Sequence, residues 1–301
     1  MNITLRQLKT LEAVARHQNY THAAKELHLS QPAVSMQIRQ LEDMLGITAA
    51  EQIGKRIFIT ADGNKVLEAA RDILQRLELM QGELEAGHGK VVGNLDIAVV
   101  TSAKHFLPRY LGAFVNAHPD VKPRLKVTNR ASILEAISQN RHDLYILGQI
   151  PGSVKMQAVP FLDNILEVIA PPEHELCGVR NIPLERLAKE RFLVREPGSG
   201  TRIAVDKVFV KHGLEITPFM ELGSSGAIKN GVMANLGLAV LSRHSLEFEL
   251  KTNSIEVLDV QNFPLRRRWF AAYPAGKSLS VAAASFMRFL TGGEQNRTPE
   301  N

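Results

Sequence analysis

Residues 21–42 read THAAKELHLSQPAVSMQIRQLE, and their spacing is that of two short helices joined by a tight turn. Thr21 is a predicted N-cap for a helix over Ala23–Leu27, because its hydroxyl can accept a hydrogen bond from a backbone N–H of the first turn. Ser30 is the predicted N-cap of the next helix, with Pro32 in its first turn, where a missing N–H costs nothing. The stretch therefore predicts a helix-turn-helix.

Apolar residues at helical spacing extend this pattern in both directions. A helix in front of the stretch is predicted by Leu5, Leu8, Leu11, Val14 and Ala15. The helix that starts after Ser30 has a predicted buried stripe of Val34, Ile38, Leu41 and Leu45. Gly46 is expected to end that helix.

The polar face of the helix after Ser30 is suited to reading DNA. It presents Gln31, Ser35, Met36 and Arg39 at helical spacing. Gln and Ser at a helix N-terminus can reach base edges, and a cation one turn later can reach a phosphate. Periodicity alone supports a helical hairpin with a merely solvated face equally well.

A short β-rich segment follows, with two cations at its tip. It runs from Ile53 to Thr60, with Lys55 and Arg56 in the middle, and is predicted to form a small wing. Residues from Asp62 to about Gly87 then have a helical composition with an apolar stripe of Val66, Ala70, Ile73, Leu77, Met80 and Leu84. Steps of four and three are typical of a coiled coil, which predicts a dimerisation helix. A helix packed on its own domain would show a similar stripe and is the alternative.

Beyond a linker at residues 87–93, short apolar strands alternate with helices. The predicted strands include Leu95–Val100, Arg124–Val127, Leu144–Leu147, Ile165–Ala170, Phe192–Val194 and Leu238–Leu241. Such alternation indicates a parallel α/β sheet. The stretch is long for one sheet and is interrupted at Pro171-Pro172 and near Pro264, so two lobes joined by crossover strands are expected.

Composition narrows the function classes. The chain of 301 residues is 45% hydrophobic and 22% charged, as in ordinary globular proteins. Residues 1–90 carry 11 Lys and Arg against 11 Asp and Glu, and residues 91–301 carry 25 against 20, so bulk charge does not locate a DNA-binding region. Cys177 is the only cysteine, which excludes an intrachain disulfide. No secretory signal or membrane span is recognised, so a cytoplasmic protein without membrane contact is expected.

Residues 1–65 resemble the head of LysR-type transcriptional regulators. The residues that carry the resemblance are the Leu-x-x-Leu helix, Ala23-Ala24, residues 30–35 (SQPAVS) and the Gln37-Ile38-x-x-Leu41-Glu42 pattern. The resemblance implies a winged helix-turn-helix on double-stranded promoter DNA, a homodimer or homotetramer, and a possible contact with RNA polymerase. One departure is Ala49-Ala50, where the family usually carries Leu-Phe. The predicted DNA contacts are Thr21, Ala23, Gln31, Pro32, Ser35, Met36, Arg39, Lys55 and Arg56.

Within that family, the chain resembles the CbbR and CmpR regulators of Calvin-cycle and inorganic-carbon genes. The matching segments are residues 34–38, 51–56, 192–202 and 221–224. The pattern departs downstream, where Ser225-Gly226 stand in place of an expected Asn-Glu pair. The resemblance implies control of carbon-fixation or inorganic-carbon uptake genes. A LysR-type regulator of another metabolic operon, with a different effector, is the alternative.

The segment EPGSGTR at residues 196–202 is a predicted strand end, loop and helix start. Exposed N–H groups at such a helix start can form an anion cradle, although the glycines can also serve only a tight turn. Three further strand ends would line the same cleft from the facing lobe. The predicted effector contacts are Thr101, Ser102, Asn129, Arg130, Gly148, Gln149, Glu196, Gly198, Ser199, Gly200, Thr201 and Arg202. A small phosphorylated or carboxylated effector fits this chemistry.

Other candidate sites are weaker. Residues 266–268 (RRR), before Trp269, could hold phosphate but are interpreted as the solvated start of a crossover strand. The histidines lack metal-ligand spacing, and neither a Walker A sequence nor a nucleophile elbow occurs, so no metal, cofactor or enzymatic activity is expected. An α/β enzyme and a solute-binding protein are the rival classes.

The expected fold is α+β overall, with three parts in chain order. These are a winged helix-turn-helix domain (1–61), a coiled-coil linker helix (62–88) and an effector domain (93–301) of the periplasmic-binding-protein type. The two lobes of the α/β effector domain are expected at about 93–163 plus 268–291 and at about 164–267.

Overall fold

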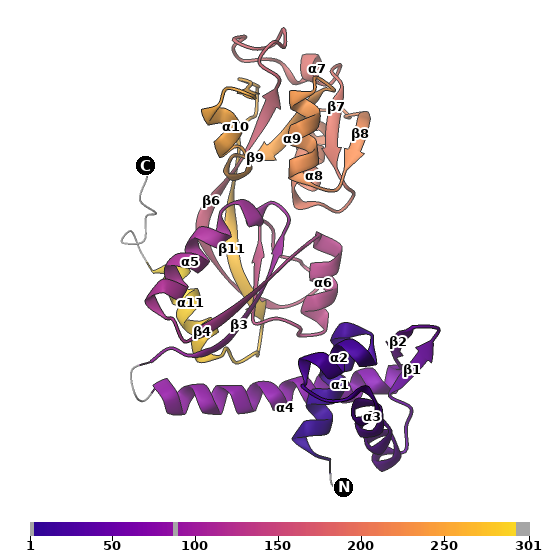
Figure 1. Ribbon diagram of the computed structural model, residues 1–301. Helices are drawn as coiled ribbons and strands as arrows, with labels where there is room; N and C mark the ends of the chain where they lie inside the picture. The colour runs from indigo at the N-terminus through magenta and orange to yellow at the C-terminus, as the bar shows by residue number, and fades with distance from the viewer. Residues whose placement is uncertain (1–2, 87–89, 293–301) are drawn as a thin grey trace. The chain divides into compact units, whose positions relative to one another are not determined.

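A computed structural model describes residues 3–86 and 90–292 of the chain. It divides into an N-terminal unit up to Lys90, to which Gln139–Arg141 also belong, and a C-terminal unit formed by the rest of the chain from Val91 (Figure 1). The predicted linker residues 87–89 lie outside the described residues. Among the described helices, none combines the length and the apolar character needed to cross a bilayer.

The N-terminal unit is a three-helix head, a two-stranded wing and one long helix. Its elements are α1 (Leu5–His17), α2 (Tyr20–Glu26), α3 (Gln31–Leu45), β1 (Ala50–Ile53), β2 (Arg56–Ile59) and α4 (Ala61–Ala86). The core of the head contains the apolar stripes expected from the sequence, including Leu11, Val14, Val34, Ile38 and Leu41. The winged helix-turn-helix prediction is therefore confirmed.

The caps of the two central helices agree with the sequence at α3 and differ at α2. The Ser30 hydroxyl accepts a hydrogen bond from Ala33 N at 3.3 Å, and Gly46 ends α3 with a φ of 66°. The N-cap of α2 is Asn19, and not Thr21, because the Asn19 side-chain oxygen accepts hydrogen bonds from the N–H groups of Thr21 and His22. The side-chain amide of Asn19 therefore caps α2 in place of the Thr21 hydroxyl.

The backbone at Ala49-Ala50 is closely packed between α3 and α4. The N–H groups of both alanines donate to Glu42 Oε1, at 2.8 and 3.1 Å, which ties the wing to α3. Ala49 is fully buried, and the start of α4 packs against its backbone. A Cβ added at Gly63 would lie 2.0 Å from the Ala49 carbonyl oxygen, so this close approach requires glycine.

The apolar stripe of α4 changes environment along the helix. Val66 packs on the core of the head and Ala70 is fully buried, as in the alternative interpretation of a helix packed on its own domain. Ile73, Met80 and Leu84, further along, are 45%, 50% and 67% exposed. Part of the stripe is therefore exposed in the described single chain from Ile73 onward, whereas Leu77 is half-buried.

The C-terminal unit is built on a nine-stranded sheet in which two long strands run through both lobes. β6 (Met156–Ala170) and β11 (Leu265–Pro274) pair antiparallel and lie side by side along the unit (Figure 1). The strand order is β4-β3-β5-β11-β6-β9-β7-β8, with β10 paired to β6. Each lobe keeps parallel strands, as predicted, while the crossover strands make the whole sheet mixed.

The remaining elements divide between the two lobes. Lobe I contains β3 (Gly93–Val100), α5 (Leu107–Ala117), β4 (Val121–Thr128), α6 (Arg130–Ser138), β5 (Leu144–Leu147) and α11 (Val281–Thr291). Lobe II contains α7 (Leu184–Leu187), β7 (Phe192–Arg195), α8 (Gly200–Lys211), β8 (Pro218–Leu222), α9 (Ser225–Met233), β9 (Leu238–Ser242), α10 (Glu247–Lys251) and β10 (Glu256–Val257).

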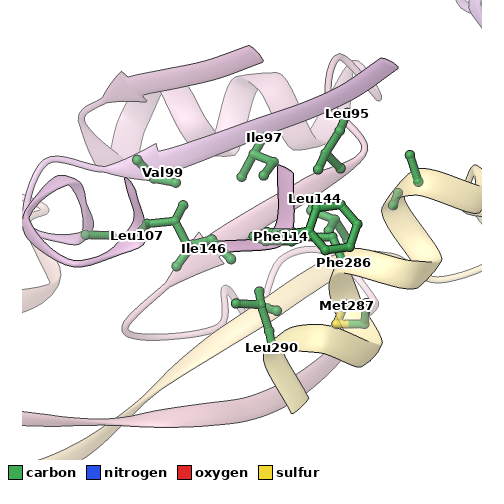
Figure 2. Close-up of a cluster of buried hydrophobic side chains, with 14 of the residues drawn as sticks. Leu95, Ile97, Val99, Leu107, Phe114, Leu144, Ile146, Phe286, Met287 and Leu290 are labelled. Carbon is green, nitrogen blue, oxygen red and sulfur yellow. The ribbon is translucent and has the colours of Figure 1, made fainter. Parts of the chain in front are cut away.

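Alternating side chains bury both faces of the sheet in each lobe. In lobe I, Leu95, Ile97 and Val99 of β3 pack with α5 and α11 on one face (Figure 2). Ala98, between them, packs with α6 on the other face. Lobe II repeats the arrangement, since Phe192 and Val194 pack with α8 while Leu193 packs with α9. Helices on both faces leave the strand ends free to form a site between the lobes.

Candidate functional site

The first candidate site is the outer face of α3. Gln31, Pro32, Met36 and Arg39 are exposed, and Ser35 is half-buried beside them. Met36 is 56% exposed, although it is apolar. Val34 and Ile38, on the opposite side of the helix, are buried in the core of the head. Packing therefore holds α3 rigidly while its polar face remains accessible, which a recognition helix requires.

The wing adds two cations to the same unit. β1 and β2 pair with Ile53 opposite Arg56, and Gly54 takes a φ of 62° in the two-residue turn between them. Lys55 and Arg56 are exposed at this tip, and no described carboxylate lies within 4 Å of either. Such cations are available to contact phosphate.

Two other predicted DNA contacts lie near α2 and differ in accessibility. Thr21 is exposed, but Ala23 is fully buried in the core of the head, where it packs among α1–α3. The Ala23 side chain is therefore a packing residue that allows the helices to approach closely, and it does not face DNA.

The second candidate site is a cleft between the lobes of the C-terminal unit. It is formed by the ends of β3, β5 and β7 and by the starts of α6 and α8, with β6 and β11 behind them. Its lining residues are Val100, Thr101, Ser102, Arg130, Gly148, Gln149, Asn164, Arg195, Glu196, Ser199, Gly200, Thr201, Arg267 and Trp269.

Most of the predicted effector residues lie around this cleft, and three do not. Asn129 accepts a hydrogen bond from Ser132 N and so caps α6. Arg202 pairs with Asp206 on its own helix, at 2.8 Å. Gly198 adopts a φ of 78° in the turn before α8, which fits the interpretation of a glycine needed for the turn. The participation of the other residues in binding remains a prediction.

A buried arginine connects the two lobes across the cleft. Arg195 is 5% exposed, and its Nε and Nη2 donate to the two carboxylate oxygens of Glu196 at 2.7 and 2.8 Å. Nη2 also donates to Thr101 Oγ1 of lobe I at 2.7 Å. Glu196 therefore neutralises Arg195, and Thr101 serves as an acceptor across the cleft.

Two further guanidinium groups in the cleft have no described carboxylate partner. Arg130 Nη1 donates to the Gln149 carbonyl at 2.9 Å. Arg267 donates to the carbonyls of Gly200 and Gly148, at 2.8 and 2.6 Å, and thereby connects the lobes. Burial lowers the pKa of both side chains, and the charge of Arg130 lowers the pKa of Arg267 further. This corner of the cleft thus has an uncompensated positive charge.

Backbone N–H groups add donors beside the two arginines. The N–H groups of Gly200 and Thr201, in the first turn of α8, have no acceptor among the described residues. The Ser199 N–H is occupied, because it donates to the Glu196 carbonyl within the turn. Of the N–H groups predicted to form an anion cradle at Gly198–Gly200, that of Ser199 is therefore unavailable, and the cradle itself remains a prediction.

Several cleft residues were missing from the sequence-based prediction. Asn164 and Trp269 line the cleft, and each has a buried polar atom without a described partner, Oδ1 and Nε1 respectively. Arg267 was interpreted as solvated, but β11 alternates and places it on the same side as buried Trp269. The spacing of two between Arg267 and Trp269 could have indicated this position from the sequence. No comparable sequence pattern indicated Arg195, which ends an apolar strand.

The cleft is narrow. Its free volume is about 30 Å³, room for about two ordered water molecules. No group of three metal-ligating side chains occurs in the described residues, and the donor set of guanidinium and N–H groups suits an anion.

Comparison with protein families explains both sites together. The model of the bacterial regulatory helix-turn-helix protein, lysR family, matches residues 5–64, and that of the LysR substrate binding domain matches residues 88–294. The chain belongs to the LysR family. It is therefore a LysR-type transcriptional regulator and not an enzyme, with DNA and a small-molecule effector as its classes of partner.

Similar proteins are known for both sequence and structure. The chain is 46% identical to the RuBisCO operon transcriptional regulator of Allochromatium vinosum, with 96% of both chains covered. It is 40% identical to the transcriptional activator CmpR of Synechocystis sp., with 96% of this chain and 95% of CmpR covered. The regulatory domain of Synechocystis CcmR in complex with 2-PG has a TM-score of 0.65 at 42% identity, covering 68% of this chain and 99% of that one.

The family fold extends over the full chain. Full-length CbnR complexed with its target DNA has a TM-score of 0.65 at 21% identity, covering 96% of this chain and 99% of that one. This similarity confirms the predicted combination of a helix-turn-helix head and an α/β effector-binding domain.

Proposed function

We propose that this LysR-type regulator controls carbon-fixation or inorganic-carbon uptake genes in response to a small phosphorylated or carboxylated metabolite bound in the cleft. The observation that carries the effector assignment is the pair of guanidinium groups, Arg130 and Arg267, which have no described carboxylate partner. Both are partly buried and have only neutral carbonyl acceptors, so an anion between them would supply the missing negative charge. The gene assignment rests on the RuBisCO operon transcriptional regulator among the relatives, and on the resemblance of the chain to CbbR and CmpR.

The proposed binding mode uses three kinds of donor. The guanidinium groups of Arg130 and Arg267 supply charge, and the free N–H groups of Gly200 and Thr201 supply directed hydrogen bonds. The positive end of the α8 dipole points toward the same place. The Thr201 hydroxyl adds a further donor, so a phosphate with several acceptor oxygens matches the set well.

Ligand entry would compete with contacts between the lobes. Arg267 holds a carbonyl of each lobe and also lines the cleft. An effector that binds its guanidinium group must therefore separate the lobes or take donors from these carbonyls. A ligand that binds one arrangement better than the other shifts the balance between them, which gives binding a means to regulate.

DNA binding is assigned to α3 and the wing. Gln31, Ser35 and Met36 are proposed to contact base edges, and Arg39, Lys55 and Arg56 to contact phosphate. The exposed half of the α4 stripe is proposed to pair with a second copy, giving a dimer and then a tetramer. The regulator would act in the cytoplasm and contact RNA polymerase at the promoter.

A gel-shift assay and calorimetry test the two parts separately. The full-length protein should bind the promoter of a neighbouring carbon-fixation or carbon-uptake gene, and 2-phosphoglycolate should alter the footprint. Calorimetry with 2-phosphoglycolate, ribulose bisphosphate, phosphoenolpyruvate and NADPH identifies the effector. Promoter binding without any response to these ligands would favour the alternative, a regulator of another operon with a different effector.

A further inference from the structure

A second hollow shares Gly148, Gln149 and Arg267 with the cleft. It is lined by residues 148–150 after β5, by Ile203, Ala204 and Lys207 of α8, and by Arg267, Arg268 and Phe270 of β11. It is open to solvent and has a volume of about 390 Å³, within the usual range for small-molecule sites of roughly 300–1,000 Å³. The hollow, called here the β11 groove, is therefore large enough for an organic ligand.

The floor of the β11 groove is apolar. Ile150, Ile203 and Phe270 come from three different elements and are only partly buried, so their side chains remain open to a ligand. Phe270 also provides a flat ring, which favours stacking on another ring. Three apolar side chains converging on one hollow favour a ligand with an apolar, planar portion.

Cations border this apolar floor. Lys207 is exposed, and no described carboxylate lies within 4 Å of its ammonium group. Arg268 is 52% exposed and lies 3.4 Å from Asp163, a long contact that leaves most of its donors free. Arg267, in the wall, is also positive and has no carboxylate partner among the described residues. No acidic side chain lines the groove.

We propose that the β11 groove is a second ligand site, for an amphipathic organic anion. An aromatic or heteroaromatic ring would lie on Ile150, Ile203 and Phe270, and a phosphate, sulfonate or carboxylate would meet Lys207 and Arg268. The combination of apolar floor and cationic border favours an amphipathic anion, because it contacts both parts of the groove, whereas an apolar molecule or a small inorganic anion would contact only one.

The groove and the cleft share a wall. Gly148, Gln149 and Arg267 line both, and Arg267 holds the carbonyls of Gly148 and Gly200. A ligand that attracts Arg267 into the groove would loosen these two bonds. Occupancy of the groove should therefore alter effector affinity, and linkage requires the reverse effect to be equal. This coupling rests on the proposed effector cleft, whereas the existence of the groove site does not.

The test uses the full-length protein and 1-anilinonaphthalene-8-sulfonate, an aromatic sulfonate that fluoresces when desolvated. Trp269 is the only tryptophan, precedes Phe270 on β11 and lines the cleft, so energy transfer from it reports probe bound near β11, and the variants below distinguish the groove from the cleft. Lys207→Glu should raise the dissociation constant of the probe, measured by this energy transfer, by about tenfold, because one charge-assisted contact is lost. Lys211→Glu, the matched control one turn further along α8 and exposed, should change it by less than about twofold.

Two results would overturn the proposal. One is equal binding to the Lys207→Glu and Lys211→Glu variants. The other is loss of the probe signal in Arg130→Gln together with competitive displacement by 2-phosphoglycolate, because the probe would then occupy the cleft. If 2-phosphoglycolate fails to bind the wild-type protein while the Lys207-dependent signal remains, the groove site stands and the proposed effector is wrong.

Discussion

Replacement of Arg130 by glutamine should separate ligand binding from folding. In the ligand-free protein Arg130 makes one hydrogen bond, to the Gln149 carbonyl, and its charge opposes that of Arg267. Glutamine keeps an N–H donor and removes the charge, so the lost interaction and the relieved repulsion partly cancel. The free energy of unfolding without ligand should therefore change by less than about 1 kcal/mol.

The same substitution should weaken effector binding strongly. A hydrogen bond to a charged group contributes about 1.5–3 kcal/mol, which corresponds to a dissociation constant raised roughly 10- to 150-fold. Stabilisation by ligand at 100 times the wild-type dissociation constant would be about 2.7 kcal/mol for the wild type and at most about 1.4 kcal/mol for the variant. A structural arginine would show the opposite pattern, a large loss of stability with little change in affinity.

Calorimetry with 2-phosphoglycolate measures the dissociation constant, and chemical denaturation measures the free energy of unfolding. Lys126→Gln is the matched control, because it removes one exposed cation from β4 of the same lobe without touching the cleft. It should leave the dissociation constant within about twofold. If Arg130→Gln and Lys126→Gln bind the ligand equally well, the uncompensated charge of the cleft does not hold the effector.

Three further predictions concern the head and the buried histidine of lobe I. Gln31→Ala should reduce the binding free energy by about 1–3 kcal/mol on the operator and change it little on random DNA. Arg39→Ala should weaken binding to both DNAs and lower the slope of log K against log salt concentration by about 1, as titrations at several salt concentrations would show. Gly63→Ala should destabilise the protein by about 1–3 kcal/mol or more, since its Cβ meets a backbone oxygen at 2.0 Å, while Gly112→Ala, with nothing within 4 Å, should be neutral or stabilising in denaturant melts. Burial, with help from nearby lysines, lowers the pKa of His105 from 6.5 to about 4, so its contribution to stability is complete above pH 6.5 and is lost as the pH falls toward 4. His105→Gln should flatten the decline of the melting temperature over that range, and an unchanged slope would assign the decline to other groups.

The sequence predicts the head well because its signals are local. Caps, a first-turn proline, a terminal glycine and helical spacing all lie within a few residues of the element they define, as Ser30 and Gly46 illustrate. Asn19 escaped prediction because two neighbouring polar residues compete to cap one helix, and the backbone geometry decides between them. The stripe of α4 was ambiguous for a different reason, because Val66 and Met80 obey the same periodicity but only Val66 meets the head.

The effector cleft was predicted from the rule that ligands bind at the ends of parallel strands, and this rule identifies only part of the cleft lining. Thr101, Gln149 and Thr201 follow or flank parallel strands, where the sheet geometry brings loops together. Asn164 and Arg267 lie inside long crossover strands, and they meet the cleft because β6 and β11 pair in one register. Register between strands about a hundred residues apart depends on tertiary packing, which a single sequence does not display.

Arg267 gives the clearest link between the two proposed ligand sites and regulation. Its two hydrogen bonds join a carbonyl of lobe I to a carbonyl of lobe II beside the cleft. An anion that binds without disturbing these bonds would have equal affinity for every arrangement of the lobes and could not shift their populations. An anion that attracts the guanidinium group, from the cleft or from the β11 groove, must weaken at least one of the bonds. A side chain shared by both cavities can therefore convert the binding of either ligand into movement of the same two lobes.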